Sequence, residues 1–423
     1  MIFIVYLEYN YYGDNYMMGI RLTKCKKQTM NKIEEYLNPK YVYFKIDENE
    51  MLKEVDDKVL KGEKILKTKF DTFIHSSVSG KIVDIVEKLD YQNKKCKFLK
   101  IENDFKEKEK YKEQDIKKIT KDEFIENLKN NGIVGLGGAG FPTYIKYNTD
   151  EAKTLIINAV ECEPYITADY NNLFNHTKEV VEALKIINKI YKLDEIIIAI
   201  KVGNRLLKEK VIPFTRKNNN IKLIEVPNLY PMGWEKSLVR YIKHTDYKRL
   251  PIEKNIIVSN VSTIYAIYES LKFNKPLIEK VVTLSGDFKN STNVKVKIGT
   301  EFKELKEVFK DYNNDEITLI TGGPMMGESV SSDEFIISNN LNSVIALKDV
   351  KEEDAITCLR CGKCSDNCPA KICPVLVKDN INDKDELKRL NVGRCIECGI
   401  CSFICPSKIN LREYLRKAKK KVK

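Results

Sequence analysis

Cysteine is concentrated near the C-terminal end of this chain, where nine of its twelve cysteines lie between Cys358 and Cys405. Eight of the nine form two runs of one pattern, C-x2-C-x2-C-x3-C-P. In such runs three thiolates bind one 4Fe–4S cube and the fourth reaches the cube of the other run. The pattern therefore predicts two clusters. Cluster one is bound by Cys358, Cys361, Cys364 and Cys405, and cluster two by Cys368, Cys395, Cys398 and Cys401.

A structural zinc site is the alternative, but zinc takes four ligands and does not need a doubled pattern. Cys373 lies outside the pattern, as a small packing residue or a substitute ligand. Residues 375–391 and the segment from Leu411 onward read as helices. We expect an all-α two-cluster ferredoxin domain over residues 345–423.

Charge gives a weaker signal. The formal net charge is +12. A basic surface could face anionic lipid or an acidic redox partner, whereas a general bias toward Lys, Asn, Ile and Tyr would give the same number. The tail KAKKKVK, residues 417–423, favours a surface role. Aromatic residues do not alternate with basic ones as in a nucleic-acid groove, so we expect no nucleic-acid partner.

The N-terminal region carries no clear targeting signal. The opening MIFIVYL is apolar but short, and it lacks a basic leader. No run of about 18 apolar residues predicts a membrane span. Met18 is a second possible start residue, so we interpret residues 1–17 as non-native or unstructured. They form part of an N-terminal extension, residues 1–39, to which no domain is assigned. Clustered cysteines without a secretion signal indicate metal ligands in a reducing compartment.

A glycine-rich stretch follows a predicted helix at residues 121–131. Thr120 and Glu123 form a capping box at its start, and Gly132 ends it. Next come four glycines in six residues, then Phe141 and, a little later, Lys146; the glycines are Gly135, Gly137, Gly138 and Gly140. Their backbone N–H groups could cradle a phosphate, to which Lys146 adds positive charge. A plain tight turn is the alternative.

Strands and helices alternate after this stretch. Strands are predicted at 154–159, 195–200, 221–226 and 255–259, and helices at 171–191, 204–210 and 262–272. This alternation favours a doubly wound, largely parallel sheet. Asn158, Glu161 and Glu163 follow the first strand, and Asn260 and Thr263 the last. Such strand ends are where ligands sit in α/β sheets.

Four stretches together resemble RnfC, a component of the Rnf ion-translocating electron-transport complex, which is similar to the NADH- and FMN-binding subunit of respiratory complex I. They are GLGGAGFPTYIK, NAVECEPYITADY, Tyr230 to Lys236 (YPMGWEK) and Thr321 to Gly327 (TGGPMMG). The resemblance runs from about residue 40 to the C-terminus.

The resemblance implies a multidomain α/β protein. It implies a small β-sandwich (barrel-sandwich hybrid) at 40–105, a Rossmann-like flavin and nucleotide domain at 119–275, and a β-grasp (SLBB) module at 276–335. It also implies roles for matched residues. Gly135, Gly137, Gly138, Gly140, Phe141 and Lys146 would form the NADH and flavin loop. Asn158, Glu161 and Glu163 would line the flavin site, and Asn260 and Thr263 would touch the flavin phosphate or ribityl chain.

The implied function is electron transfer between NADH and ferredoxin, through FMN and the two clusters, with no side chain assigned to acid–base catalysis. A flavin belongs between nicotinamide, which gives hydride, and cubes, which take single electrons. The expected partners are membrane subunits of an Rnf-type complex and ferredoxin, with the chain peripheral at the cytoplasmic face of the membrane. Two alternatives stay open: a soluble relative that reduces a cobalamin or an amino-acid reductase system, and an electron-carrying adaptor without flavin.

The chain departs from the family at named positions. Where the family usually has Cys and Asp-x-Arg, this chain has Ala168-Asp169-Tyr170. Where the family usually has Glu-x-Asn-Lys, this chain has Lys201-Val-Gly203-Asn204-Arg205. An N-terminal His-Gly-Gly is also missing.

Overall fold

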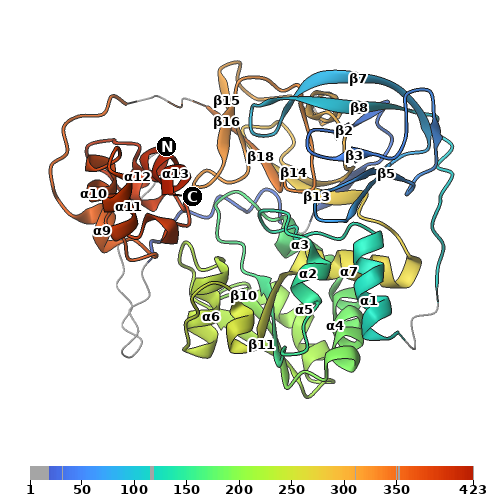
Figure 1. Ribbon diagram of the computed structural model, residues 1–423, viewed down its shortest axis with the longest axis horizontal. Coiled ribbons are helices and arrows are strands. Elements are labelled where there is room, and N and C mark those ends of the chain that lie inside the picture. The colour runs from blue at the N-terminus through green and yellow to red at the C-terminus, as the bar shows by residue number, and fades with distance from the viewer. Residues whose placement is uncertain are drawn as a thin grey trace.

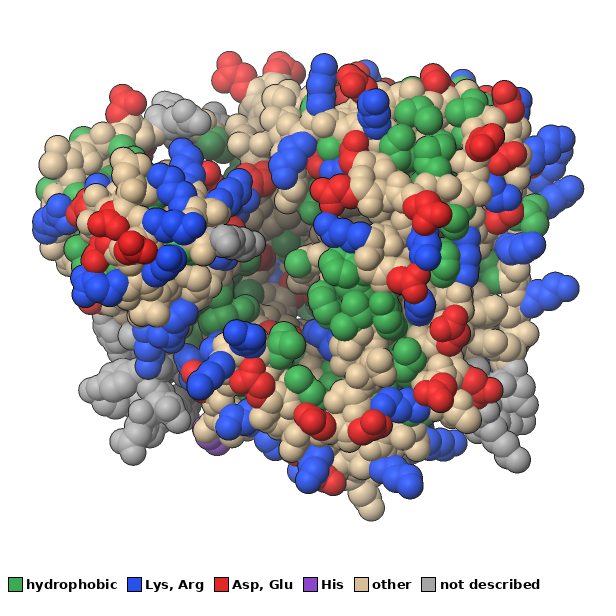
Figure 2. Space-filling model, in the orientation of Figure 1, with side chains coloured by type: hydrophobic (Ala, Val, Ile, Leu, Met, Phe, Trp, Pro, Cys, Tyr) green, Lys and Arg blue, Asp and Glu red, His purple; other side chains and the backbone are tan. Residues whose placement is uncertain are grey.

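The computed structural model describes residues 19–30, 32–114, 119–309, 311–348, 350 and 353–422. Three bodies are visible in Figure 1: a β-rich body at the upper right, an α/β body below it, and a small helical domain on the left. Figure 2 shows that the face between the helical domain and the other two is hollowed, with apolar side chains around the hollow. The N-terminal positions 1–17, which the sequence marks as an extension, lie outside the described residues.

A small β-sandwich forms the outer part of the β-rich body. Val42, Phe44, Ile82 and Leu99 are buried in its core because alternate residues of each strand face inward. One sheet has the order β17-β7-β8-β2, with β4 paired to β7, and the other has the order β3-β5-β6. The strands are β2 (Tyr41–Lys45), β3 (Glu50–Met51), β4 (Lys58–Val59), β5 (Lys64–Lys67), β6 (Phe73–His75), β7 (Gly80–Asp90), β8 (Lys95–Asn103) and β17 (Phe335–Ile336).

A four-stranded parallel sheet forms the centre of the α/β body, in the order β11-β10-β9-β12. This confirms the predicted doubly wound topology. The strand order places the topological switch point between β9 and β12, which is where ligands bind in such sheets. The strands are β9 (Thr154–Ala159), β10 (Glu195–Lys201), β11 (Ile221–Val226) and β12 (Ile256–Asn260).

Helices cover both faces of this sheet, and a separate apolar core fills each side. The predicted capping box of α1 forms, with Thr120 and Glu123 bonded to each other. The helix expected over 171–191 is two helices, with a break at His176. The helices are α1 (Lys121–Asn130), α2 (Thr143–Tyr147), α3 (Ala168–Asn175), α4 (Thr177–Tyr191), α5 (Arg205–Thr215), α6 (Glu235–Lys243), α7 (Val261–Phe273) and the 3-10 turn η1 (Pro251–Lys254).

A six-stranded mixed sheet lies between these two bodies, in the order β1-β14-β13-β18-β15-β16. β1 comes from the segment that the sequence left as an uncertain extension, and it pairs parallel to β14. β18 lies beyond the expected boundary at 335, yet it pairs with both β13 and β15. The elements are β1 (Ile33–Tyr36), β13 (Glu279–Gly286), β14 (Thr292–Lys297), α8 (Phe302–Val308), β15 (Ile317–Thr321), β16 (Glu328–Val330) and β18 (Ser343–Lys348).

The C-terminal domain is helical. The helix expected over 375–391 is interrupted after Asp379 and resumes at Lys384, where Asp383 caps the new start. Its elements are α9 (Lys363–Asp366), α10 (Pro374–Asp379), α11 (Lys384–Arg389), η2 (Val392–Arg394), α12 (Ile400–Phe403) and α13 (Leu411–Val422). Within the described ranges, no helix is both long and apolar enough to cross a bilayer.

Candidate functional site

The glycine-rich loop joins α1 to α2 and lies against the end of β12. Its ends are held together by a hydrogen bond from the Gly135 amide to the Phe141 carbonyl, 2.9 Å long. A Cβ at Gly137 would stand 2.6 Å from Asn260 Nδ2, so only glycine allows this approach. A Cβ at Gly138 would meet no atom within 4 Å. The loop therefore has one side packed against Asn260 and another side that is open at Gly138.

The N-terminus of α7 completes this cradle. Asn260 caps the helix, because its Oδ1 accepts hydrogen bonds from the amides of Ser262 (2.8 Å) and Thr263 (3.4 Å). Thr263 Oγ1 accepts a hydrogen bond of 2.9 Å from the amide of Leu136, which fastens the loop to the helix. The positive end of a helix dipole beside open backbone amides is suited to a phosphate.

Lys146 and Asn158 lie near the carboxyl ends of β12 and β9 and, with the glycine-rich loop, mark the crevice expected at this switch point. Lys146 Nζ donates to the Val258 carbonyl at 2.8 Å and lies 3.3 Å from a carboxylate oxygen of Glu235. Asn158 Nδ2 donates to the Gly233 carbonyl at 2.8 Å. The sequence pattern gave no role to Glu235, although it belongs to the YPMGWEK motif.

The carboxylates of Glu161 and Asp169 are buried next to this crevice. Glu161 Oε1 accepts a hydrogen bond from the Asp169 amide, and Asp169 accepts from Asn260 and Ser262. Burial raises the pKa of Glu161 to about 7, and nearby Lys26 opposes the rise. Its Oε2 is buried without a hydrogen bond, 3.9 Å from Lys26 Nζ. Lys26 comes from an N-terminal segment to which the sequence pattern assigned no role.

Glu163 is turned toward the loop between β15 and β16. Its oxygens accept hydrogen bonds from the amides of Met325 (3.1 Å) and Met326 (2.9 Å). Burial raises the pKa of Glu163 to about 7, and these two bonds oppose the rise. In this structure Glu163 joins the α/β body to the TGGPMMG loop.

Phe141 is on the surface, with 47% of its area exposed. Its ring centroid lies 6.5 Å from that of Phe70, which comes from the β-sandwich. A core position is therefore excluded for Phe141. No sequence signal pointed to Phe70.

The predicted ligands of cluster two gather in the C-terminal domain. Cys368, Cys395, Cys398 and Cys401 line one small cavity. Burial raises the pKa of the Cys398 thiol to about 12, and the neighbouring Cys368 and Cys395 raise it further. Four thiols that repel each other as thiolates, in an apolar enclosure, fit a cationic iron–sulfur cube. In the described part of the chain, no three His, Cys, Asp or Glu side chains are grouped for a single metal ion.

The ligands predicted for cluster one lie on the outer side of this domain. Cys358, Cys364 and Cys405 are partly buried against the same apolar core. Cys361 is exposed. Cys373 accepts a hydrogen bond of 3.1 Å from Ser365 Oγ. Cluster one would therefore be nearer to solvent than cluster two.

Tyr230 connects the crevice to cluster two. Its hydroxyl donates a hydrogen bond of 2.6 Å to the Cys398 carbonyl. Ile20, Tyr230, Met325, Cys398 and Ile400 form one buried cluster. The interface is reinforced by Arg412 of α13, which donates to the carbonyls of Met326 and Gly327.

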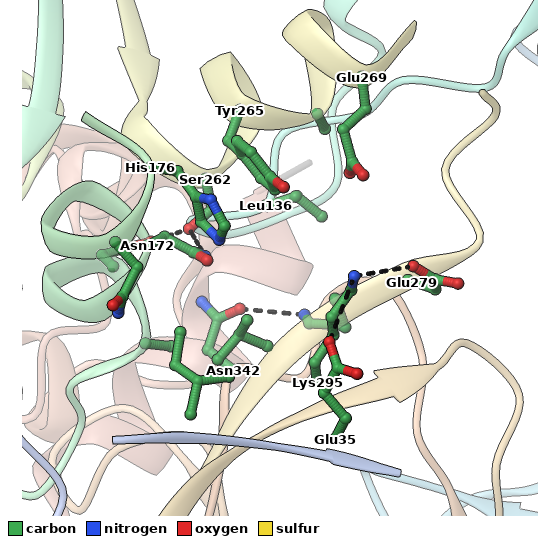
Figure 3. A pocket seen from close by; sticks show the side chains of 17 residues that line it. Glu35, Leu136, Asn172, His176, Ser262, Tyr265, Glu269, Glu279, Lys295 and Asn342 are labelled. Atoms are coloured by element: carbon green, nitrogen blue, oxygen red, sulfur yellow. Dashed lines mark hydrogen bonds and ion pairs between the residues drawn. The ribbon is translucent and has the colours of Figure 1, made fainter. Parts of the chain in front are cut away.

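A separate cavity of about 280 Å³ lies between α3, α7 and β13. Figure 3 shows His176 and Tyr265 on one side of it and Lys295 bridging Glu35 and Glu279 on the other. His176 stacks on Tyr265, with ring centroids 4.1 Å apart. Lys280 donates to the Asn339 carbonyl and to Asn342. Several polar groups of these walls are thus paired with one another, whereas Asn172 Oδ1 is buried without a hydrogen-bond partner.

Comparison with known proteins agrees with this arrangement. Residues 15–106 match the RnfC barrel-sandwich hybrid domain, residues 128–269 the Nuo51 FMN-binding domain, and residues 351–406 the 4Fe–4S dicluster domain. The chain is also similar in structure to an NAD+-reducing NiFe-hydrogenase, with a TM-score of 0.51 and 15% identity, over 72% of this chain and 63% of that one. At that identity the likeness concerns the fold alone.

Two relatives extend over most of the chain. One, from the proton-translocating ferredoxin:NAD(+) oxidoreductase complex of Clostridium ljungdahlii, is 31% identical, over 85% of this chain and 82% of that protein. Another, from the ion-translocating oxidoreductase complex of Buchnera aphidicola, is 32% identical, over 79% and 73%. The corresponding protein of Vibrio cholerae is 31% identical, but the chain spans 44% of its length.

Fold, flavin crevice and paired cysteine runs define an oxidoreductase subunit that has an FMN-binding domain and a two-cluster iron–sulfur domain. More particularly, the chain belongs to the RnfC family, whose members are components of ion-translocating oxidoreductase complexes.

Proposed function

We propose that this chain transfers electrons between NAD(H) and ferredoxin, as the flavin- and iron–sulfur-bearing subunit of an Rnf-type ion-translocating complex. The observation that carries the proposal is the direct contact of Tyr230, in the loop that lines the crevice, with the backbone of the cluster-two ligand Cys398. When bound, FMN supplies the exchange between hydride transfer and single-electron transfer, and each cube carries one electron at a time.

The residues of the crevice would hold the flavin. The amides of the loop from Gly137 to Gly140, beside the start of α7 that Asn260 caps, would bind its phosphate. Lys146 and Asn158 would orient the ring, and Thr263 would hold the loop closed on α7. The buried Oε2 of Glu161 accepts no hydrogen bond and could accept one from a polar group of the ligand. Phe141 and Phe70, partly exposed at the open side, would face the nicotinamide.

The burial of the predicted cysteine ligands indicates the order in which the two clusters would carry electrons. Cluster two, whose ligands are buried and touch Tyr230, would exchange electrons with the flavin. Cluster one, whose ligand Cys361 is exposed, would exchange them with a partner protein. A route of this kind keeps the inner cube away from water and the outer one within reach of another chain.

The partners proposed are ferredoxin and the membrane subunits of the complex, with the chain peripheral on the cytoplasmic side. Lys417, Lys420 and Lys421 are exposed on α13 and would suit an anionic surface. We also assign the mixed sheet of residues 276–348 to the β-grasp (SLBB) class, because its order of strand, strand, helix and strand matches that expectation.

The experiment is an anaerobic purification followed by denaturation and optical titration. We expect one FMN per chain in the supernatant, and bleaching of the flavin in the folded protein by NADH. Bleaching by reduced ferredoxin but not by NADH or NADPH would reject the nicotinamide assignment. Protein that retains both clusters but releases no flavin would reject the proposal in favour of an electron-carrying adaptor.

A further inference from the structure

A second, larger cavity lies beside the flavin crevice, at the carboxyl ends of β9 and β10. Its volume is about 1180 Å³. Its walls come from residues 23–30, from the ends of the two strands, and from β13 and β18, with Lys408 of the C-terminal domain at its margin. The described residues that line it do not include the glycine-rich loop, Lys146 or Asn260. The cavity therefore lies on the β10 side of Glu161, and Glu161 is a wall that it shares with the proposed flavin site.

The lining of this cavity is strongly basic. It contains six lysines, Lys24, Lys26, Lys27, Lys201, Lys348 and Lys408, against two acids, Glu161 and Asp287. Lys26 is engaged with Glu161, since its Nζ donates to the Glu161 carbonyl at 2.8 Å. Lys408 is paired with Glu353, which lies outside the lining. The walls therefore keep an excess of positive charge.

Lys201 at the end of β10 is the most informative of these residues. It is only 7% exposed, and it forms no hydrogen bond or ion pair with any described residue. Burial lowers its pKa to about 7, and the adjacent Lys26 and Lys24 lower it further. Keeping Lys201 charged at a buried position without a partner is costly, so an anion bound in the cavity would stabilise its ammonium form.

The size and the apolar part of the lining indicate more than a bare phosphate. Tyr165, Tyr170, Met30 and Leu347 contribute aromatic and apolar surface. A volume of this size matches or exceeds that of typical pockets for small organic ligands, which is roughly 300–1,000 Å³. We propose that this cavity binds a nucleoside diphosphate, with the phosphates on Lys201, Lys24 and Lys26 and the base against the tyrosines. This site is additional to the FMN and NAD(H) sites of the proposed function.

Isothermal titration of the anaerobic holoprotein with ADP tests the proposal. We expect binding of about one ADP per chain, weakened about ten-fold or more in Lys201→Met because a buried charge-assisted contact is lost. Lys201→Arg retains the charge and should stay within a few-fold of the parent. Lys222→Met is the matched control, because Lys222 is an exposed lysine on the neighbouring strand, paired with Glu195. If Lys201→Met does not fold, Lys24→Met, at an exposed position, should still weaken ADP several-fold.

Three results would overturn the inference. One is the absence of ADP binding at millimolar concentration, and a second is equal binding by the parent and Lys201→Met. The third is displacement of ADP by NADH in strict competition, which would identify the cavity as the nicotinamide site. Pyrophosphate that binds as tightly as ADP would reject the nucleotide and leave a phosphate site. FMN content and bleaching by NADH should be unchanged in Lys201→Met, so failure of the proposed function and failure of this inference give different results.

Discussion

Single cysteines decide the iron content of this protein. Cys361 is the exposed ligand predicted for cluster one, whereas Cys373 lies outside both runs. We expect Cys361→Ser to lower the iron content by about half, or to unfold the C-terminal domain, because serine is a poor ligand for a cube. Iron and acid-labile sulfide analysis of anaerobic protein measures this. Cys373→Ser is the control and should retain all iron. Full iron in Cys361→Ser would show that the ligand set is wrong.

His75 gives the β-sandwich a defined pH dependence. Its ring is buried, and burial lowers its pKa to about 3, with nearby Lys64 adding to the effect. The folded state therefore keeps His75 neutral, while the unfolded chain takes up a proton below about pH 6.5. Its contribution to stability is complete above that pH and is lost as the pH falls toward 3.

The measurement is the melting temperature of the parent and of His75→Gln between pH 7.5 and pH 5. The melting temperature of the parent should fall more than that of the variant over this range. The difference corresponds to a change in the free energy of unfolding of up to about 1.4 kcal/mol per pH unit. Parallel curves would mean that His75 is protonated without cost in the folded protein.

Only some of the individual residues of the candidate site could be predicted from the sequence. The cysteines could be assigned as ligands because the spacing within each run is short and local, and the four assigned to cluster two line one cavity; the two ligand sets stay a prediction. The contacts of Glu163 with Met325 and Met326 were not, because they join residues more than 160 positions apart. Lys26 and Phe70 were missed for the same reason: each lies in a segment without a pattern of its own and acquires its place only through tertiary packing.

Among the elements, α7 is the one on which the flavin crevice depends most. Asn260 caps its start, and Asp383 caps α11 in the same way, with hydrogen bonds from the amides of Asp385 and Glu386. Loss of either cap should cost about 1 kcal/mol of stability. We therefore expect both Asn260→Ala and Asp383→Ala to be destabilised, Asn260→Ala the more because it also loses its hydrogen bond to Asp169, and only Asn260→Ala to lose FMN. Flavin-to-protein ratios after gel filtration measure this, and equal retention of FMN would contradict the crevice assignment.

The loop before α6 is the element that joins crevice and cluster. Tyr230→Phe removes the hydroxyl that bonds to the Cys398 carbonyl but preserves the ring. We expect reduction of the flavin by NADH to be unaffected and reduction of the clusters to slow several-fold, since the contact orients the two sites. Stopped-flow absorbance separates the two phases. Tyr191→Phe is the control, because that hydroxyl also bonds to a backbone carbonyl, that of Tyr147, but far along the chain from the cysteines.

Elements with strong local signals were predicted well. The strands over 154–159 and 221–226 have the predicted bounds, because each is a short segment rich in β-branched residues with polar residues close to both ends. The break at His176 and the strand β1 were not foreseen. A continuous helical pattern spans the break, and β1 has no alternation that would distinguish it from a loop; it is a strand because β14 offers it an open edge.

At the scale of the whole molecule, the order of domains along the chain brings the crevice and the cubes together. The N-terminal segment crosses to the α/β body at Ile20, which pairs with Tyr230, and the C-terminal domain closes on the same place through Cys398. This convergence could not be read from the sequence, because each contact joins segments that are far apart. In the proposed function, the flavin site and cluster two would then form one unit, with cluster one outside it.

The proposed order of electron transfer is tested most directly by rapid-freeze electron paramagnetic resonance after the anaerobic protein is mixed with NADH. The Cys361→Ser variant distinguishes the signal of cluster one from that of cluster two. We predict that the flavin bleaches first, that the signal of cluster two follows, and that cluster one is reduced last. Reduction of cluster one before cluster two, or of either cube without bleaching of the flavin, would contradict the account.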